Sequence, residues 1–365
     1  MSNTSKRSRR LLIGTGVALT GAMFALAGCS ASGGGSSDGP TEVTVMYKSS
    51  EFTEDMIAEF EAENPDITIE FIEYDQTRLN AMVTAGDAPD LVRAGPSANL
   101  FAKGLATNLD DYLASSEVLS ADSLLPANDA WRWDGSTRGE GSYYGIIKDW
   151  SPDATIWQNE ALLEEAGVEP PDSIDALIEA ATTLNTGRQK GLFVGNDGGI
   201  GALLGPMLWS AGGDFLNEDG TAPAFNTERA AAAYTKLKEL NDTDALLIGS
   251  PTDYWDPSAF IQNLTAMQWT GLWAMPQIIA EVGAENFGVL PWPKSDDEGT
   301  PSTFWGGWGE CVGGKSQNLD AAKALVKWMW IDNTEIQQDW NLGYGFHVPP
   351  RTEAAESAEP LPDPP

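Results

Sequence analysis

The pattern of apolar and polar residues after position 41 predicts strands that alternate with helices. Residues 42–47 are rich in β-branched and aromatic side chains, and residues 53–64 follow with apolar side chains at helical spacing. A second strand is expected over 67–74, a helix around 79–83 and a short strand over 90–92. The order strand, helix, strand, helix, strand favours a mainly parallel sheet covered by helices.

The middle of the chain repeats this alternation. A helix is expected over 173–184, with Ser173 as its N-cap, and a strand over 192–194. A helix over 227–240 and a strand over 287–290 follow. These elements predict a second α/β unit, and a further helix is expected over 319–331 near the end of the chain.

The first forty residues have the features of an export signal and a tether. A basic cluster at 6–10 precedes an uncharged stretch over 11–27, and Leu26-Ala27-Gly28-Cys29 resembles the lipobox of bacterial lipoproteins. We therefore expect cleavage of the signal peptide 1–28, lipidation of Cys29 and a flexible Gly/Ser tether over 29–40. The basic cluster fits the Sec and the twin-arginine export routes equally well.

Composition and charge exclude several classes of function. A chain of 365 residues is long enough for two domains. Its formal charge of −33 would repel phosphate backbones, so no nucleic-acid partner is expected. One histidine and two cysteines cannot supply the usual zinc ligands, and neither a P-loop nor a Gly-x-Ser-x-Gly motif occurs. We expect no metal, no cofactor and no catalytic residue.

Tryptophan is the unusual component, with fourteen residues. Several lie beside Gly, Pro, Asp or Ser, as in Asp149-Trp150, Trp255-Asp256 and Trp308-Gly309-Glu310. A sugar ring has an apolar face and a rim of hydroxyls, so an indole beside a carboxylate suits it. Trp328, Trp330 and Trp340 follow helical patterns and are assigned to the hydrophobic core.

An ordered set of segments resembles the family 1 extracellular solute-binding proteins of ABC sugar importers. It covers about residues 41–350, and its more specific parts are Ala85-Gly86-Asp87-Ala88-Pro89-Asp90 and the stretch from Trp209 to Phe215. The resemblance implies a two-lobed, type II periplasmic-binding-protein-like α/β fold, each lobe a mainly parallel sheet flanked by helices, with a ligand cleft between the lobes. Such proteins close by hinge bending and dock on a permease.

The resemblance also implies domain boundaries. Lobe one would comprise 41–148 and a return segment 293–345, lobe two would comprise 149–292, and 346–365 would be a C-terminal tail. The chain would cross between the lobes near 147–150 and again near 291–293. The family usually continues into further helices after the segment that matches residues 343–351, so we expect the chain to be truncated or its second lobe to be completed differently.

Site residues carried over from the family fall on both lobes. The wall of lobe one would be Tyr47, Glu51, Asp90, Trp305, Gly307, Trp308 and Glu310. Lobe two would contribute Asp149, Trp150, Trp209, Gly213, Trp255 and Trp273.

The resulting hypothesis is a monomeric, lipid-anchored binding protein on the extracellular face of the cell membrane. It would bind a neutral sugar, most simply an oligosaccharide, and deliver it to ABC transporter permease subunits without altering it. One alternative keeps the fold but binds a cation such as a polyamine. Another is a secreted glycosidase that uses a carboxylate pair.

Overall fold

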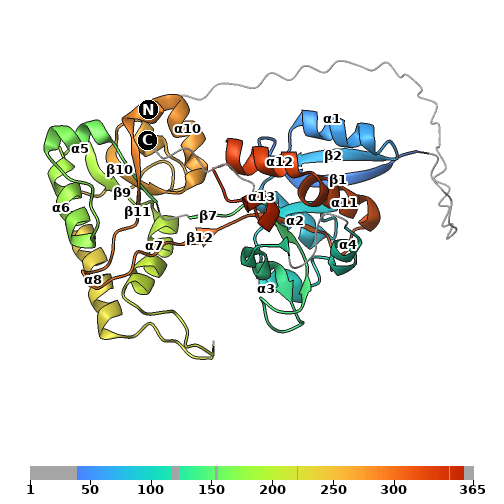
Figure 1. The fold of residues 1–365 in the computed structure, drawn as a ribbon, viewed down its shortest axis with the longest axis horizontal. Helices are drawn as coiled ribbons and strands as arrows, with labels where there is room; N and C mark the ends of the chain where they lie inside the picture. The colour runs from blue at the N-terminus through green and yellow to red at the C-terminus, as the bar shows by residue number, and fades with distance from the viewer. Residues whose placement is uncertain (1–38, 117–122, 153–154, 220, 345, 357–365) are drawn as a thin grey trace, which may run out of the picture. The chain divides into compact units, whose positions relative to one another are not determined.

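The computed structural model describes residues 39–116, 123–152, 155–219, 221–344 and 346–356. The predicted signal peptide, Cys29 and nearly all of the tether lie outside the described residues. The described residues from Pro40 onward belong to one compact unit, which is built around two β-sheets (Figure 1). Below, lobe one means the first sheet with its helices, and lobe two means the second sheet with its helices.

The first sheet is mixed rather than mainly parallel. Its strand order is β2-β1-β3-β13-β6, formed by β1 (Thr41–Tyr47), β2 (Ile67–Glu73), β3 (Leu91–Ala94), β6 (Ile146–Ile147) and β13 (Gly309–Val312). Strand β1 pairs in parallel with β2 and β3, as the βαβαβ pattern predicts. Strand β13 comes from the later part of the chain and pairs antiparallel with β3 and β6. The expectation of a mainly parallel sheet was therefore wrong for the half of the sheet that contains β13 and β6.

Alternation along β1 explains why the sheet is covered on both faces. Val43, Val45 and Tyr47 pack in one apolar cluster, whereas Met46 packs in another on the opposite face. The covering elements of lobe one are α1 (Glu54–Glu63), α2 (Gln76–Ala85), α3 (Ala98–Ala102), α4 (Asp110–Ser115), η2 (Pro126–Trp131), α11 (Leu319–Val326), η5 (Lys327–Asp332), α12 (Thr334–Gln338), η6 (Asp339–Tyr344) and α13 (Thr352–Glu356). A small hairpin joins β4 (Arg132–Trp133) to β5 (Ser142–Tyr143).

The second sheet is also mixed. Its order is β11-β8-β10-β9, formed by β8 (Thr155–Gln158), β9 (Lys190–Phe193), β10 (Thr265–Thr270) and β11 (Gly288–Pro291). Only β9 and β10 are parallel, because β8 runs antiparallel to both β10 and β11. The helices of lobe two are α5 (Glu160–Ala166), α6 (Ile174–Leu184), α7 (Asp197–Ser210), α8 (Glu228–Asp242), α9 (Ser258–Ile261), η3 (Leu272–Ala274), α10 (Met275–Val282) and η4 (Ala284–Asn286).

Helix α6 shows how local sequence sets these elements. The Ser173 hydroxyl accepts a hydrogen bond from the Ala176 backbone N–H, as the predicted N-cap requires. Ile174, Leu177 and Leu184 lie on the buried side of the helix in the core of lobe two. The predicted helix and its N-cap are both confirmed.

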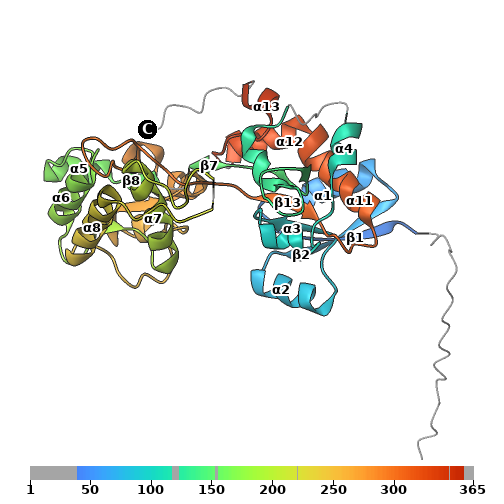
Figure 2. The same ribbon diagram turned by 90° about the horizontal axis from the view of Figure 1, so that it is seen from below.

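Two short strands link the sheets. Strand β7 (Ser151–Pro152) follows β6 and pairs antiparallel with β12 (Trp305–Gly306), so the two linking segments run side by side (Figure 2). The first link follows β6 directly and lies next to the crossing expected near 147–150. The second lies later than Pro291–Pro293, because Lys294 still bridges to Ser173 and Asp296 still binds Arg229 in lobe two.

The predicted C-terminal tail begins too early. Val348 forms a β-bridge with Trp150, and Phe346 packs against an apolar cluster of lobe two. Arg351 is buried and donates to the Ile331 carbonyl oxygen, and α13 follows it. Residues from Phe346 to Glu356 therefore belong to the fold.

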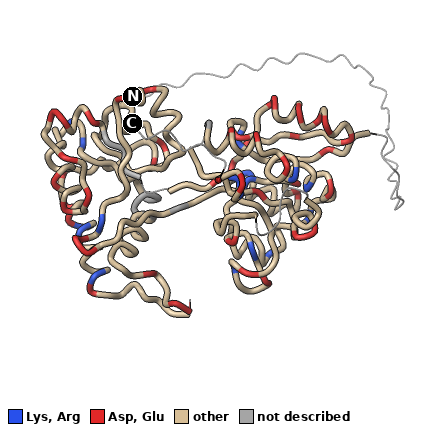
Figure 3. The backbone as a smooth tube through the Cα atoms, in the orientation of Figure 1, with Lys and Arg blue, Asp and Glu red and all other residues tan. Residues whose placement is uncertain are grey.

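Acidic side chains are distributed rather than clustered. Figure 3 shows Asp and Glu residues along the helices of both lobes. Such a distribution favours solubility and does not by itself identify a ligand.

Candidate binding site

One end of the first sheet gathers several of the predicted site residues. Strand β1 ends at Tyr47, and Gly309 at the start of β13 pairs with Ala94 at the end of β3. Trp308 immediately precedes Gly309, so it lies at the same end of the sheet, which we call the carboxyl edge. Ligands of open α/β sheets commonly bind at this edge.

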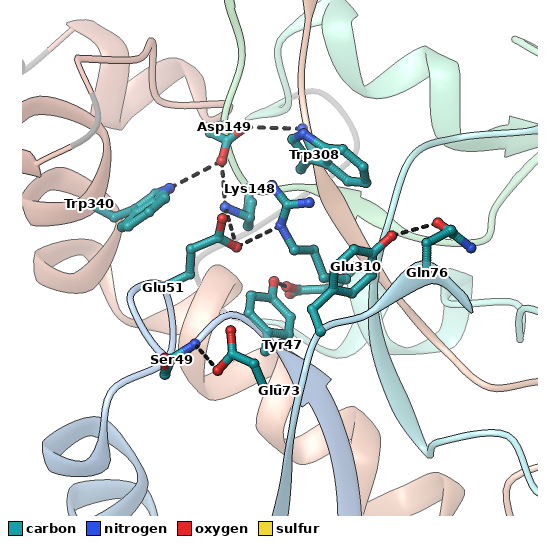
Figure 4. Close-up of polar contacts among 12 residues, drawn as sticks. Tyr47, Ser49, Glu51, Glu73, Gln76, Lys148, Asp149, Trp308, Glu310 and Trp340 are labelled. Carbon is teal, nitrogen blue, oxygen red and sulfur yellow. Dashed lines mark hydrogen bonds and ion pairs between the residues drawn. The ribbon is translucent and has the colours of Figure 1, made fainter. Parts of the chain in front are cut away.

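Buried charges lie beneath the carboxyl edge (Figure 4). Arg93 Nε donates to Glu51 Oε2 at 2.7 Å, and Lys148 Nζ lies 3.2 Å from the same oxygen. Lys148 Nζ also donates to Asp149 Oδ2 at 2.5 Å. All four side chains are nearly inaccessible to water, so the pairs form in a region of low dielectric where each charge needs its partner.

Asp149 connects this network to the polypeptide backbone and to a second indole. Its Oδ1 accepts from the Trp308 backbone N–H at 3.0 Å, and its Oδ2 accepts from Trp340 Nε1 at 3.2 Å. Burial by itself would raise the pKa of Asp149, but the Lys148 ammonium and the hydrogen bonds outweigh it, so the pKa lies well below its ordinary value. Asp149 is therefore ionised, and it fixes the position of Trp308.

Trp308 presents an exposed indole above this network. The residue is 39% exposed, and the Arg93 guanidinium carbon lies 3.7 Å from the ring centroid. Tyr74 meets the same ring edge-on at 6.2 Å. These interactions form a closed circuit, which we call the Trp308 network. Arg93 holds the indole, Asp149 holds the Trp308 backbone, and Glu51 and Lys148 join Arg93 to Asp149.

Tyr47 and Glu310 form a pair inside the protein. The Tyr47 hydroxyl donates to Glu310 Oε2 at 2.5 Å, and both residues have no exposed surface. Burial raises the pKa of Glu310 well above its ordinary value. Its other oxygen, Oε1, has no hydrogen-bond partner in the described part of the chain. The pair therefore lies under the carboxyl edge, not on its surface.

Asp90 lies at the opposite end of the strands. Its carboxylate accepts from the Thr44 backbone N–H, from the Ser316 hydroxyl and from Asn318 Nδ2. It precedes β3, whereas Ala94 ends that strand at the carboxyl edge. The structure does not bring Asp90 together with Tyr47 and Trp308.

A second aromatic group lies in lobe two, on the last turns of α7. Trp209 stacks on Phe304 with centroids 6.4 Å apart and meets Phe215 edge-on at 6.0 Å. Its Nε1 donates to Asp214 at 3.2 Å. Gly213 follows the helix, and a Cβ there would approach Leu208 Cδ1 to 2.7 Å. Phe304 and Phe215 are 38% and 40% exposed, so this group also offers aromatic surface to a ligand.

Trp255 and Trp273 form a third aromatic group. Trp273 Nε1 donates to the Trp255 carbonyl oxygen at 2.9 Å, and the Trp255 side chain is 57% exposed. Tyr254 meets the Trp273 ring edge-on. Trp150 is partly buried in the core of lobe one.

The remaining predicted residues lie on the second link. Trp305 belongs to β12, and its side chain lies outside the described residues. Gly307 must be glycine, because a Cβ would come within 2.1 Å of the Asp149 carbonyl oxygen on the other link. Its place in the site is to let the two links pass each other closely.

Sequence reasoning missed Arg93 and Lys148, which belong to the Trp308 network, and Trp340, which binds to it. Arg93 and Lys148 each follow two buried apolar residues at the end of a strand, and a charge in that position was the available signal. Trp340 was assigned to the core and does pack there partly, but its indole N–H also binds Asp149.

Neither a metal-ligating cluster nor a spanning helix emerges from the described residues. No group of three or more His, Cys, Asp or Glu side chains within them could hold a metal ion. None of their helices is both long and apolar enough to cross a bilayer.

Two mixed α/β lobes joined by paired linking strands define the class of two-lobed solute-binding proteins. The family model for bacterial extracellular solute-binding proteins matches residues 55–364, and the chain belongs to this family. Its members are binding proteins of transporters. The predicted membership of an extracellular solute-binding family is thereby confirmed, and so is the two-lobed α/β fold.

Individual proteins are similar to this chain in sequence or in fold. A Brucella abortus protein described as a binding protein is 28% identical over 265 residues, which are 67% of this chain and 60% of the relative. The GacH receptor of Streptomyces glaucescens, solved unliganded and with acarbose, is 25% identical with a TM-score of 0.71, over 87% of this chain and 82% of the receptor. An ABC substrate-binding protein from Listeria monocytogenes, solved with cycloalternan, is 22% identical with a TM-score of 0.72, over 88% of this chain and 84% of that protein.

Proposed function

We propose that this chain is the lipid-anchored receptor of an ABC-type importer and that it binds a neutral sugar, specifically an oligosaccharide. The proposal rests on the exposed Trp308 indole, which the Trp308 network holds at the carboxyl edge. An indole fixed at both its ring and its backbone is a preorganised platform for the apolar face of a pyranose. The GacH receptor was solved with acarbose and the Listeria protein with cycloalternan, and these complexes support an oligosaccharide ligand.

The aromatic groups of lobe two would supply the opposing contacts. Trp209 with Phe304, and Trp255 with Trp273, expose rings on that lobe. A ligand that touches Trp308 and one of these groups would favour a closed form over an open form, because it gains contacts in only one of them. The closed form would then dock on the permease.

The carboxylates have a different role in this proposal from the direct sugar contacts first expected. Both oxygens of Asp149 are bound, by Trp308, Lys148 and Trp340, and Glu51 Oε2 binds Arg93 and Lys148. We assign them to positioning Trp308, and direct hydrogen bonds to the sugar would come from groups that are more exposed. The same burial argues against a glycosidase, whose acid and base must reach the glycosidic bond.

A cationic ligand is disfavoured by the charges at the carboxyl edge. Arg93 and Lys148 lie beneath it, and Lys48 directly follows β1. Burial, followed by repulsion from Arg93, lowers the pKa of Lys48. The carboxylates at this edge are therefore already paired with cations and are not free to bind a polyamine.

The test is a titration of the purified protein with maltotriose, mannobiose, acarbose and spermidine, followed by tryptophan fluorescence and calorimetry. We expect binding of at least one sugar that is largely unchanged by added salt. Trp308→Ala should weaken it at least tenfold, whereas Trp328→Phe, on the outer side of lobe one where Trp328 binds Glu63, should not. Binding of spermidine alone, or of no compound, would refute the proposal.

The anchor is tested separately. Cys29→Ser should move the protein from the membrane fraction to the medium and abolish incorporation of labelled palmitate. Retention of both in the variant would refute lipidation at this position.

A further inference from the structure

A hollow in lobe one contains an indole–carboxylate pair that the proposed site does not use. It has a volume of about 620 Å³, within the range of roughly 300–1,000 Å³ that is typical of small-molecule sites. Its lining includes Trp133 and Asp134, adjacent in the sequence, together with Phe101, Ser142 and Tyr144. This is the same combination of indole and acid that marks the predicted sugar contacts elsewhere in the chain.

The hairpin β4–β5 brings these side chains to one face. Trp133 pairs directly with Ser142, and Tyr144 follows two residues later, so all three point to the same side of the hairpin. Arg132 and Tyr143 form the neighbouring pair on the other side, where Tyr143 enters the core. The alternation therefore separates a core face from a face that lines the hollow.

The aromatic wall is fixed by α3. Phe101 is buried, and its ring lies 6.2 Å from Trp133 and 5.7 Å from Tyr144, with interplanar angles of 42° and 36°. Trp133 and Tyr144 remain only partly buried. Two rings held against a buried third ring present a rigid apolar surface to the hollow.

Polar groups around this wall have unused hydrogen-bonding capacity. Asp134 Oδ1 accepts from the backbone N–H groups of Ser136 and Thr137, which holds the carboxylate in place and lowers its pKa. Its Oδ2 has no partner among the described residues, and the same holds for the Ser142 and Tyr144 hydroxyls. An acceptor and two hydroxyl groups beside an aromatic wall match the hydroxyl rim of a sugar.

The hollow is separate from the carboxyl edge. Its floor includes Gly104, whose carbonyl oxygen lies against Gly314 in the turn after β13. That turn is at the end of β13 opposite Trp308, on the side of the sheet where Asp90 lies. A ligand at Trp308 and a ligand in the hollow would therefore occupy different ends of lobe one.

We propose that this hollow is a second carbohydrate site that binds an uncharged pyranose ring. Trp133 and Tyr144 supply the stacking surface, and Asp134 and Ser142 bind ring hydroxyls. The inference does not depend on Trp308 or on closure of the lobes.

The experiment follows the Trp133 indole N–H resonance by NMR in the Trp308→Ala variant, so that binding at the carboxyl edge does not contribute. The resonance is assigned by its absence in Trp133→Phe, which keeps an aromatic ring against Phe101. Maltotriose and mannobiose are added up to millimolar concentrations. We expect a saturable shift with at least one sugar.

Two further variants make the result specific. Ser142→Ala combined with Tyr144→Phe removes only the two hydroxyl groups and should weaken binding about tenfold, which corresponds to about 1.4 kcal/mol. Asp242→Asn, on the exposed face of α8 in lobe two, should leave the affinity unchanged. An unmoved Trp133 resonance with both sugars, or a non-saturating shift, would overturn the proposal. So would equal affinity in the hydroxyl variant. A retained Trp133 response, together with a sugar affinity of the purified protein that Trp308→Ala leaves unchanged, would instead refute the proposed function alone.

Discussion

Asp149→Asn tests whether the Trp308 network stabilises the fold. The substitution keeps the size of the side chain but removes the negative charge from a site where Lys148 is fully buried and the Asp149 side chain is 5% exposed. Breaking a buried ion pair typically costs about 3–5 kcal/mol, because the remaining charge has lost its compensation. Lys148 keeps its contact with Glu51, but Glu51 must then balance both Lys148 and Arg93. We therefore expect a loss of about 3 kcal/mol in the free energy of unfolding.

The assay is urea unfolding followed by tryptophan fluorescence, with an exposed ion pair of the same protein as the control. Lys238 and Asp242 are paired on α8 with side chains 71% and 56% exposed. Asp242→Asn should cost about 0.5 kcal/mol or less. Adding Lys148→Met to Asp149→Asn should recover part of the loss, because the unpaired ammonium is removed. If Asp149→Asn and Asp242→Asn lowered the free energy of unfolding equally, the argument that the Trp308 network stabilises the fold through buried charge would be wrong.

Three further predictions concern residues near the Trp308 network. Because the folded-state pKa of Glu310 is raised, its contribution to stability is complete below the unfolded pKa near 4.5 and is lost as pH rises toward the folded pKa. The stability of Glu310→Gln relative to the native chain should therefore increase with pH above this value, and a pH-independent difference would contradict the assignment. Tyr47→Phe leaves Glu310 Oε2 without its donor and should cost about 1–3 kcal/mol in urea unfolding, so an unchanged midpoint would count against the bond. Gly307→Ala should lower the melting temperature, since its Cβ would meet Asp149 O at 2.1 Å, whereas Gly201→Ala on α7, with no atom within 4 Å of its Cβ, should not.

The secondary structure of the chain was largely predictable because its elements are amphipathic and well capped. Thr53, Ser173 and Thr227 each accept the first N–H bonds of the helix they precede, and the apolar spacing places Phe60 and Leu177 in the core. The direction of the strands was harder to predict from the sequence. Whether β13 returns parallel or antiparallel depends on long-range pairing, which local periodicity does not contain.

The site was only partly predictable for a related reason. Tryptophans beside Gly and Asp gave Trp308 and Trp255 as candidate sugar contacts, and both residues are exposed. A sequence does not show whether a carboxylate faces solvent or a buried cation. Glu51 and Asp149 therefore looked like ligand contacts until their partners Arg93 and Lys148 were seen.

The closed circuit around Trp308 limits how such a receptor can be re-engineered as a biosensor. Replacing any one of its four charges leaves the remaining buried charges unbalanced, so single substitutions there would lower expression before they altered selectivity. Libraries aimed at new analytes should instead vary the partly exposed aromatic neighbours Tyr74, Phe215 and Phe304, whose replacement leaves that circuit intact.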